Sequence, residues 1–123
     1  MRDLQWSKGE KQIAQRAFRQ ALAREADEIV QRVRRQAAAI TELEDAWRLE
    51  DYLREVRKEL AQKYDYRYSV LLYVFANLIE EGWLSLDELA GLGEDKLTPL
   101  TQMLAIRQRL ARENNTEGEV GRL

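Results

Sequence analysis

The sequence contains no cysteine, no histidine and only one proline among its 123 residues. Without cysteine, the chain forms no disulfide and no zinc ribbon, and this composition fits a reducing compartment. Without histidine, it has no imidazole metal ligand, no Ser/His or Cys/His nucleophilic pair, and not the commonest general base near neutral pH. These absences argue against most hydrolases and metalloenzymes. We therefore expect a protein that is not an enzyme and that carries no cofactor.

Long hydrophobic runs and an excess of charge of one sign are also missing. The most apolar stretch, Val70 to Ile79, is much shorter than the ~20 residues that cross a bilayer, and residues 1–9 lack the apolar core of a signal peptide. Twenty basic residues against 22 acidic ones give a net charge of −2, so no strong field attracts nucleic acid. We expect a cytoplasmic protein that neither inserts into a membrane nor binds nucleic acid.

The most abundant residue types favour helix. Ala, Leu, Glu, Arg and Gln dominate, and 34% of the residues are charged, which predicts an all-α fold with a single domain over residues 1–113. Ser7 and Glu10 have the spacing of a capping box, and the apolar stripe that follows continues to about Ile40, ~50 Å of helix. A helix this long extends beyond a small core. Its far end needs a partner, either from this chain or from a second copy.

A second capping-box spacing, Thr41 to Glu44, predicts a break or kink before a second helix that runs to about Gln62, although a continuous helix also fits. A compact helical head is expected over residues 65–113. Its first helix, around Val70 to Ile79, is apolar on nearly every face, as a central helix wrapped by others is. Gly82 is predicted to end this helix, and Ser85 to Glu88 to open a short helix that ends near Gly91. Thr98-Pro99 is predicted to open a last helix. Residues 114–123 are predicted to form a flexible tail.

Trp47 lies on the charged face of its helix. The apolar seam of that helix consists of Ala46, Leu49, Leu53, Val56 and Leu60. At ~100° per residue, Trp47 is roughly 140° from the centre of the seam. Its neighbours on that face are Glu50, Asp51, Arg54 and, at the edge, Arg57.

Two interpretations of this face remain open. One is a solvated surface with weak intrahelical ion pairs, Glu50 with Arg54 and Asp51 with Arg54 or Arg57. The other is a protein interface, which we favour because tryptophan and arginine are enriched at binding hot spots.

A second aromatic group consists of Tyr64, Tyr66, Tyr68 and Tyr73. The spacing of two in the first three predicts rings on several sides of a helix start, closing the core with their hydroxyls at its rim, rather than a stacking platform for bases. Either a buried or an exposed position is compatible with Tyr73. The adjacent acidic pairs, such as Glu80-Glu81, do not share a helix face and predict no metal or acid–base site.

An ordered series of residues supports a family resemblance. The series consists of Trp6-Ser7, Ala17-Phe18, Arg24-Glu25, Ile40-Thr41, Trp47, Leu49, Asp51, Leu53, Lys63-Tyr64-Asp65, Arg67, Ser69, Val74-Phe75-Ala76, Glu81-Gly82 and Glu88-Leu89, and it fades after Asp95-Lys96. In this series the chain resembles the fluorescence recovery proteins of cyanobacteria, the accessory factors of the orange carotenoid protein.

The resemblance implies an all-helical homodimer of antiparallel type, with a long N-terminal helix and a helical head. It implies binding to the light-activated carotenoid protein, mainly through that protein's C-terminal domain, faster return to the orange form, and release from the phycobilisome. The family's functional patch corresponds to Trp47, Asp51 and Arg57 beside the dimer seam, and a partner-contacting aromatic corresponds to Tyr73. Glu50 stands where the family usually has histidine. The alternative is a dimeric helical adaptor of the same fold with a different client.

Overall fold

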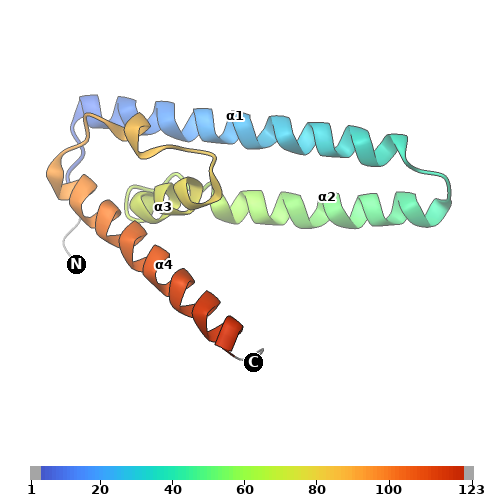
Figure 1. Cartoon of the computed structure of the whole chain (residues 1–123). Helices are drawn as coiled ribbons and strands as arrows, with labels where there is room; N and C mark the ends of the chain where they lie inside the picture. Colours follow the sequence, from blue (N-terminus) through green and yellow to red (C-terminus); the bar gives the residue numbers. More distant parts are fainter. Residues whose placement is uncertain (1–3, 121–123) are drawn as a thin grey trace.

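The computed structural model describes residues 4–120, with side chains to residue 115, and within that range it is built from helices without any strand. The helices are α1 (Lys8–Ala38), α2 (Leu43–Lys63), α3 (Leu71–Glu81), the short 3₁₀-helix η1 (Leu86–Leu89) and α4 (Glu94–Val120). Figure 1 shows α1 and α2 as a long hairpin, with α3 and η1 at one end and α4 projecting away on the side of α2. The predicted all-α fold is confirmed.

The hairpin begins and turns close to where the sequence predicts. The Ser7 hydroxyl accepts a hydrogen bond from the Glu10 amide (3.1 Å), and the Glu10 carboxylate accepts one from the Ser7 amide (2.9 Å), so the capping box is present. The predicted break at Thr41 is also present. Its capping residue is Asp45 rather than Glu44, because Asp45 Oδ2 accepts from the amides of Thr41 (3.1 Å) and Glu42 (3.2 Å).

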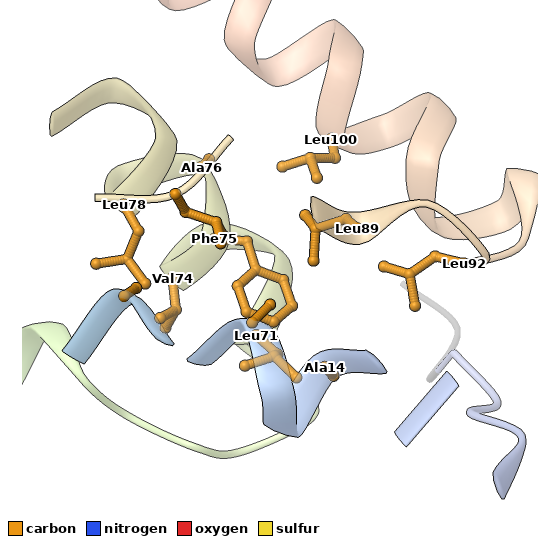
Figure 2. Packing of buried hydrophobic residues seen from close by; sticks show 12 residues of the cluster. Ala14, Leu71, Val74, Phe75, Ala76, Leu78, Leu89, Leu92 and Leu100 are labelled. Atoms are coloured by element: carbon orange, nitrogen blue, oxygen red, sulfur yellow. The ribbon is translucent and has the colours of Figure 1, made fainter. Parts of the chain in front are cut away.

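The core lies at the head, where residues of α3, η1 and α4 form one buried cluster with the first half of α1. Six residues of α3 are buried, and Phe75 at the centre has no exposed surface. Figure 2 shows its ring among leucines from α3, η1 and α4. Ala14, Ala17 and Ala21 form the buried stripe of α1 and belong to the same core cluster. The predicted central helix is therefore confirmed, and it ends at Gly82, whose φ of 87° is left-handed.

The C-terminal helix differs from the prediction at both ends. We expected it to open at Thr98-Pro99, but α4 begins at Glu94, and Pro99 lies inside it. The amides of Lys96 and Leu97 both donate to the Gly93 carbonyl oxygen (3.0 Å), so the first turn forms before the proline. Helix α4 also continues to Val120, past Asn114 where the sequence predicts the tail. Residues 121–123 of that tail lie outside the described part.

A buried lysine fixes the start of α4 to the start of α1. Lys96 is 1% exposed, and its Nζ donates to the Gln5 carbonyl (2.6 Å), to Glu10 Oε1 (3.1 Å) and to Asp95 Oδ2 (3.0 Å). Hydrogen bonds from the Ser7 and Gly93 amides and from Lys96 lower the pKa of Glu10 to about 2. We call Glu10 and Lys96 the terminal lock. Sequence analysis did not identify it, because the partners lie 86 residues apart.

The far part of the hairpin has no core of its own. The last buried residue of α1 is Glu25, and α2 has no buried residue at all. We call residues 26–62 the arm. Since helix pairs of this kind gain most of their stability from burial of apolar side chains, the arm is only partly stabilised within one chain.

Candidate protein-binding site

The Trp47 face of α2 is exposed as predicted. Trp47 keeps 53% of its surface exposed, and the four charged residues predicted beside it, Glu50, Asp51, Arg54 and Arg57, are exposed as well. We call these five residues the arm patch. The structure places all of them along one helix, spanning almost three turns. They form a convex surface of charged groups around one indole, which suits contact with another macromolecule better than enclosure of a small ligand.

The opposite face of α2 packs on α1, but incompletely. Ala46, Leu49, Val56 and Leu60 are partly buried against α1, whereas Leu53, predicted in the same seam, is 41% exposed. Leu43, next to the turn, is 69% exposed. Within one chain, the apolar side chains at the tip and middle of α2 are therefore not fully covered.

Only some of the predicted ion pairs in the arm patch form. Glu50 pairs with Arg54 one turn later, as predicted. No ion pair within the described residues joins Asp51 to Arg54 or Arg57, which corrects the alternative proposed for them. Neither Asp51 nor Arg57 therefore has an ion-pair partner among the residues that the structure describes. Charges of this kind are suited to complementary charges on a partner.

Tyr52 was missed by sequence analysis. It is partly buried, and the guanidinium of Arg32 from α1 lies 4.6 Å from its ring centroid. This cation–π contact joins the two helices of the arm. The signal for it was the position of Tyr52, three residues after Leu49 and four before Val56, on the side of α2 that packs on α1. The contact fixes the rotation of α2 and so helps to turn the arm patch outwards.

Tyr73 belongs to a separate surface. It is 47% exposed on α3, a helix whose neighbouring residues Leu72 and Val74 are buried. About 24 Å of helix separates Trp47 from the end of α2, where the head begins. One chain therefore does not bring Tyr73 and Trp47 together into one site.

The rings of three tyrosines are placed as predicted, with two corrections, of which the first is that the Tyr66 hydroxyl is buried rather than at the rim of the core. Tyr64, Tyr66 and Tyr68 are partly buried around Phe18 and the core, as expected for rings that close it. They do not begin a helix, because residues 64–67 have no regular secondary structure, residues 68–70 form a turn, and α3 starts only at Leu71. The Tyr64 hydroxyl donates to Glu25 Oε1 (2.8 Å), and burial together with this carboxylate raises the pKa of Tyr64.

The junction of arm and head is a compact ionic cluster. Lys63 Nζ, at the end of α2, donates to Glu25 Oε2 of α1 (2.7 Å) and to Glu81 Oε1 of α3 (2.6 Å). Burial opposes the charge on Lys63, but these two hydrogen bonds raise its pKa above the usual value. One ammonium group thus joins three helices. We call Glu25, Lys63, Tyr64 and Glu81 the junction cluster.

Two hollows adjoin this cluster. One, of 420 Å³, is lined by Glu59, Gln62, Lys63, Asn77 and Glu81, between α2 and α3. The other, of 240 Å³, follows the α1–α2 groove past Tyr52 to Trp83. Carboxylates line both hollows, but among the described residues no group of three or more acidic side chains is placed to hold a metal ion. No helix of the described part is long and apolar enough to cross a membrane.

Comparison with known proteins shows that the chain is similar to one protein family. The model of the photoprotection regulator fluorescence recovery protein family matches residues 6–104. The fluorescence recovery protein of Synechocystis sp. strain PCC 6803 is 44% identical over 91 residues, which are 74% of this chain and 84% of the relative.

Solved structures show the same similarity. The fluorescence recovery protein of Fremyella diplosiphon aligns with a TM-score of 0.78 at 51% identity, and that of Synechocystis sp. PCC 6803 with 0.77 at 42%. Each alignment covers 82% of this chain and 98% of the solved chain. The matched range contains the arm patch, Tyr73, the junction cluster and the terminal lock. The chain belongs to the fluorescence recovery protein family of photoprotection regulators.

Proposed function

We propose that this protein binds the photoactivated orange carotenoid protein, mainly through its C-terminal domain, and accelerates its return to the resting orange form. The binding also promotes release of the carotenoid protein from the phycobilisome, which ends photoprotective quenching. The observation that carries this proposal is the family match over residues 6–104, which contains the exposed arm patch and Tyr73. The patch and Tyr73 are the surfaces that contact the client.

The proposed mechanism needs no covalent chemistry. A protein that binds the closing arrangement of its client more tightly than the open one lowers the barrier to closure. Each ~1.4 kcal/mol of such differential binding accelerates the return about tenfold. One tryptophan and one arginine desolvated on a partner supply energies of this size.

A homodimer completes the arm in this proposal. Helix α2 has no buried residue, and Leu53 at its midpoint remains 41% exposed. Antiparallel pairing of two α2 helices about Leu53 covers these side chains and extends the arm into a bundle. In that register, Trp47 of one copy lies opposite Glu59 of the other, close to the head, so that the arm patch and Tyr73 of different copies approach each other.

The direct test mixes the protein with purified photoactivated orange carotenoid protein and follows the dark return by absorbance. We expect the return rate to rise with protein concentration until it saturates. An unchanged rate at saturating concentration rejects the proposed function.

One observation favours a second candidate, a dimeric adaptor with a different client. Glu50 is exposed in the arm patch and paired with Arg54, so a fixed negative charge lies where the resemblance places histidine. This candidate predicts a stable dimer that leaves the return of the carotenoid protein unchanged. It also predicts a co-purifying protein that is lost in Trp47→Ala.

Arg57→Leu provides a test of the arm patch itself. Arg57 is exposed and contributes nothing to the core, so the thermal midpoint is expected to stay within a few degrees of the original. We expect about a tenfold lower rate acceleration, because one hydrogen-bonded charge is lost from the interface. Arg34→Leu, at an exposed position of α1, is the matched control. A sharp drop in the melting temperature of Arg57→Leu contradicts this assignment.

A further inference from the structure

The last part of α4 extends beyond the range that the family model matches. The family model ends at residue 104, and the solved relatives are covered over 98% of their own length while matching only 82% of this chain. Helix α4 nevertheless continues without interruption to Val120. We call residues 105–115, the part of this segment with described side chains, the extension.

The direction of the extension is fixed by its first turn. Arg107 Nη1 donates to Asn77 Oδ1 (2.7 Å) and to Glu80 Oε2 (2.8 Å), both on α3. Asn77 also lines the 420 Å³ hollow between α2 and α3. The extension therefore starts beside this hollow and leaves the head on the side of α2 (Figure 1).

The extension carries apolar side chains that the described residues leave about half exposed. Ile106 and Leu110 are 50% and 49% exposed. They lie four residues apart and so share one face of the helix. The same segment contains three arginines against one glutamate, which makes it basic in an acidic protein.

The tip of the arm is acidic, which complements the basic charge of the extension. Residues 42–51 contain five acidic residues against one arginine. Leu43 and Trp47, in the same segment, are 69% and 53% exposed. An acidic segment with uncovered apolar side chains fits a basic segment with uncovered apolar side chains.

The proposed homodimer would bring the arm tip of one copy near the extension of the other. In the α2 pairing about Leu53, Leu43 of the second copy lies opposite Lys63 and Trp47 opposite Glu59. Lys63 and Glu59 line the hollow beside which the extension starts. The tip of the second copy is thus brought to the foot of the extension.

We propose that the extension clasps the arm tip of the second copy, with Ile106 and Leu110 packed on its Leu43 and the guanidinium of Arg109 facing its carboxylates. This inference rests on the proposed homodimer. It gives the chain an interface formed by residues 105–115, which lie outside the range that the family model matches.

Because the chain has no cysteine, cross-linking tests the clasp directly. The full-length Leu43→Cys and Leu110→Cys variants are mixed, allowed to exchange subunits and treated with a short bismaleimide. Arg16→Cys, at an exposed position on α1, replaces Leu43→Cys in the control mixture. We expect about tenfold more cross-linked heterodimer in the test mixture, because a held pair has a far higher effective concentration than a random one.

Leu53→Cys alone separates the clasp from the dimer, since it cross-links two copies at the axis. If Leu53→Cys cross-links but Leu43→Cys with Leu110→Cys does not exceed the control, the clasp is rejected and the dimer stands. If neither cross-links, the pairing register and the clasp are both rejected. Neither result changes the outcome of the recovery assay, which tests the client.

The charges are tested separately. Arg109→Glu is expected to raise the dimer dissociation constant about tenfold in a dilution series, whereas Arg16→Glu, with the same change in net charge, leaves it unchanged. Equal effects of the two variants reject the electrostatic part of the clasp.

Discussion

Trp47→Ala is expected to raise the protein concentration needed for half-maximal recovery of the carotenoid protein about thirtyfold or more. The indole is the largest exposed apolar group of the arm patch, and truncation of a hot-spot tryptophan costs about 2 kcal/mol or more. Since 53% of the side chain is exposed in the single chain, its removal leaves no cavity in the core. The helical content measured by circular dichroism should therefore stay unchanged.

Leu86→Ala is the control for this variant. Leu86 is also an exposed apolar residue, at 36%, but it belongs to η1 in the head and to neither proposed surface. Its effect on recovery is expected to be less than twofold, within the range of neutral surface substitutions. Similar recovery curves for Trp47→Ala and the unmodified protein show that the arm patch is not the contact surface.

Glu10→Gln is expected to lower the free energy of unfolding at pH 7 by about 3 kcal/mol, because it removes a charged partner from the buried Lys96. Urea denaturation measures the loss. Lys96→Met is expected to cost less, since it replaces the buried ammonium by an apolar side chain of similar length and leaves Glu10 with its backbone donors. The double variant should regain part of the stability lost in Glu10→Gln.

The effect of Glu10 depends on pH in a defined direction. The pKa of Glu10 is about 2 in the folded protein, below the ordinary value of 4.5. A carboxyl group with a lowered pKa stabilises the folded state above its unfolded pKa and loses that contribution as the pH falls through the folded pKa. The difference between Glu10→Gln and the unmodified protein should therefore shrink between pH 4.5 and pH 2. A difference that stays constant over this window contradicts the terminal lock.

Local sequence signals predicted the parts of the fold that depend on short-range contacts. The capping box at Ser7, the stop at Gly82 and the exposed position of Trp47 follow from spacing along one helix, and the structure has all three. The start of α4 was predicted wrongly because the preference of Pro99 for a first turn was outweighed by hydrogen bonds to Gly93.

Long-range pairs could not be predicted from spacing. In the sequence, Lys96 resembles an ordinary surface lysine, because its partner Glu10 lies on a helix far away along the chain. Glu25 likewise resembles any other acidic residue of a helix, because its partner Lys63 lies on another helix. The exposure of Leu53 has another cause. Leu53 was predicted in the packed seam but is 41% exposed, because the helices of one chain do not cover that position. For the arm patch, the sequence indicated which side chains are displayed, while the contact of Tyr52 with Arg32 became visible only with both helices in place.

Because α2 has no buried residue, we expect the order of the arm to depend on the concentration of the protein. In the proposed homodimer, a second copy completes this helix and stabilises it by mass action, so dilution loosens the arm while the head, with its own core, keeps its structure. Proteolytic cleavage near the turn at residues 39–42 should then become faster as the protein is diluted. With such a dimer, a cell that makes more of this protein gains both more molecules and a larger fraction of them with an ordered arm.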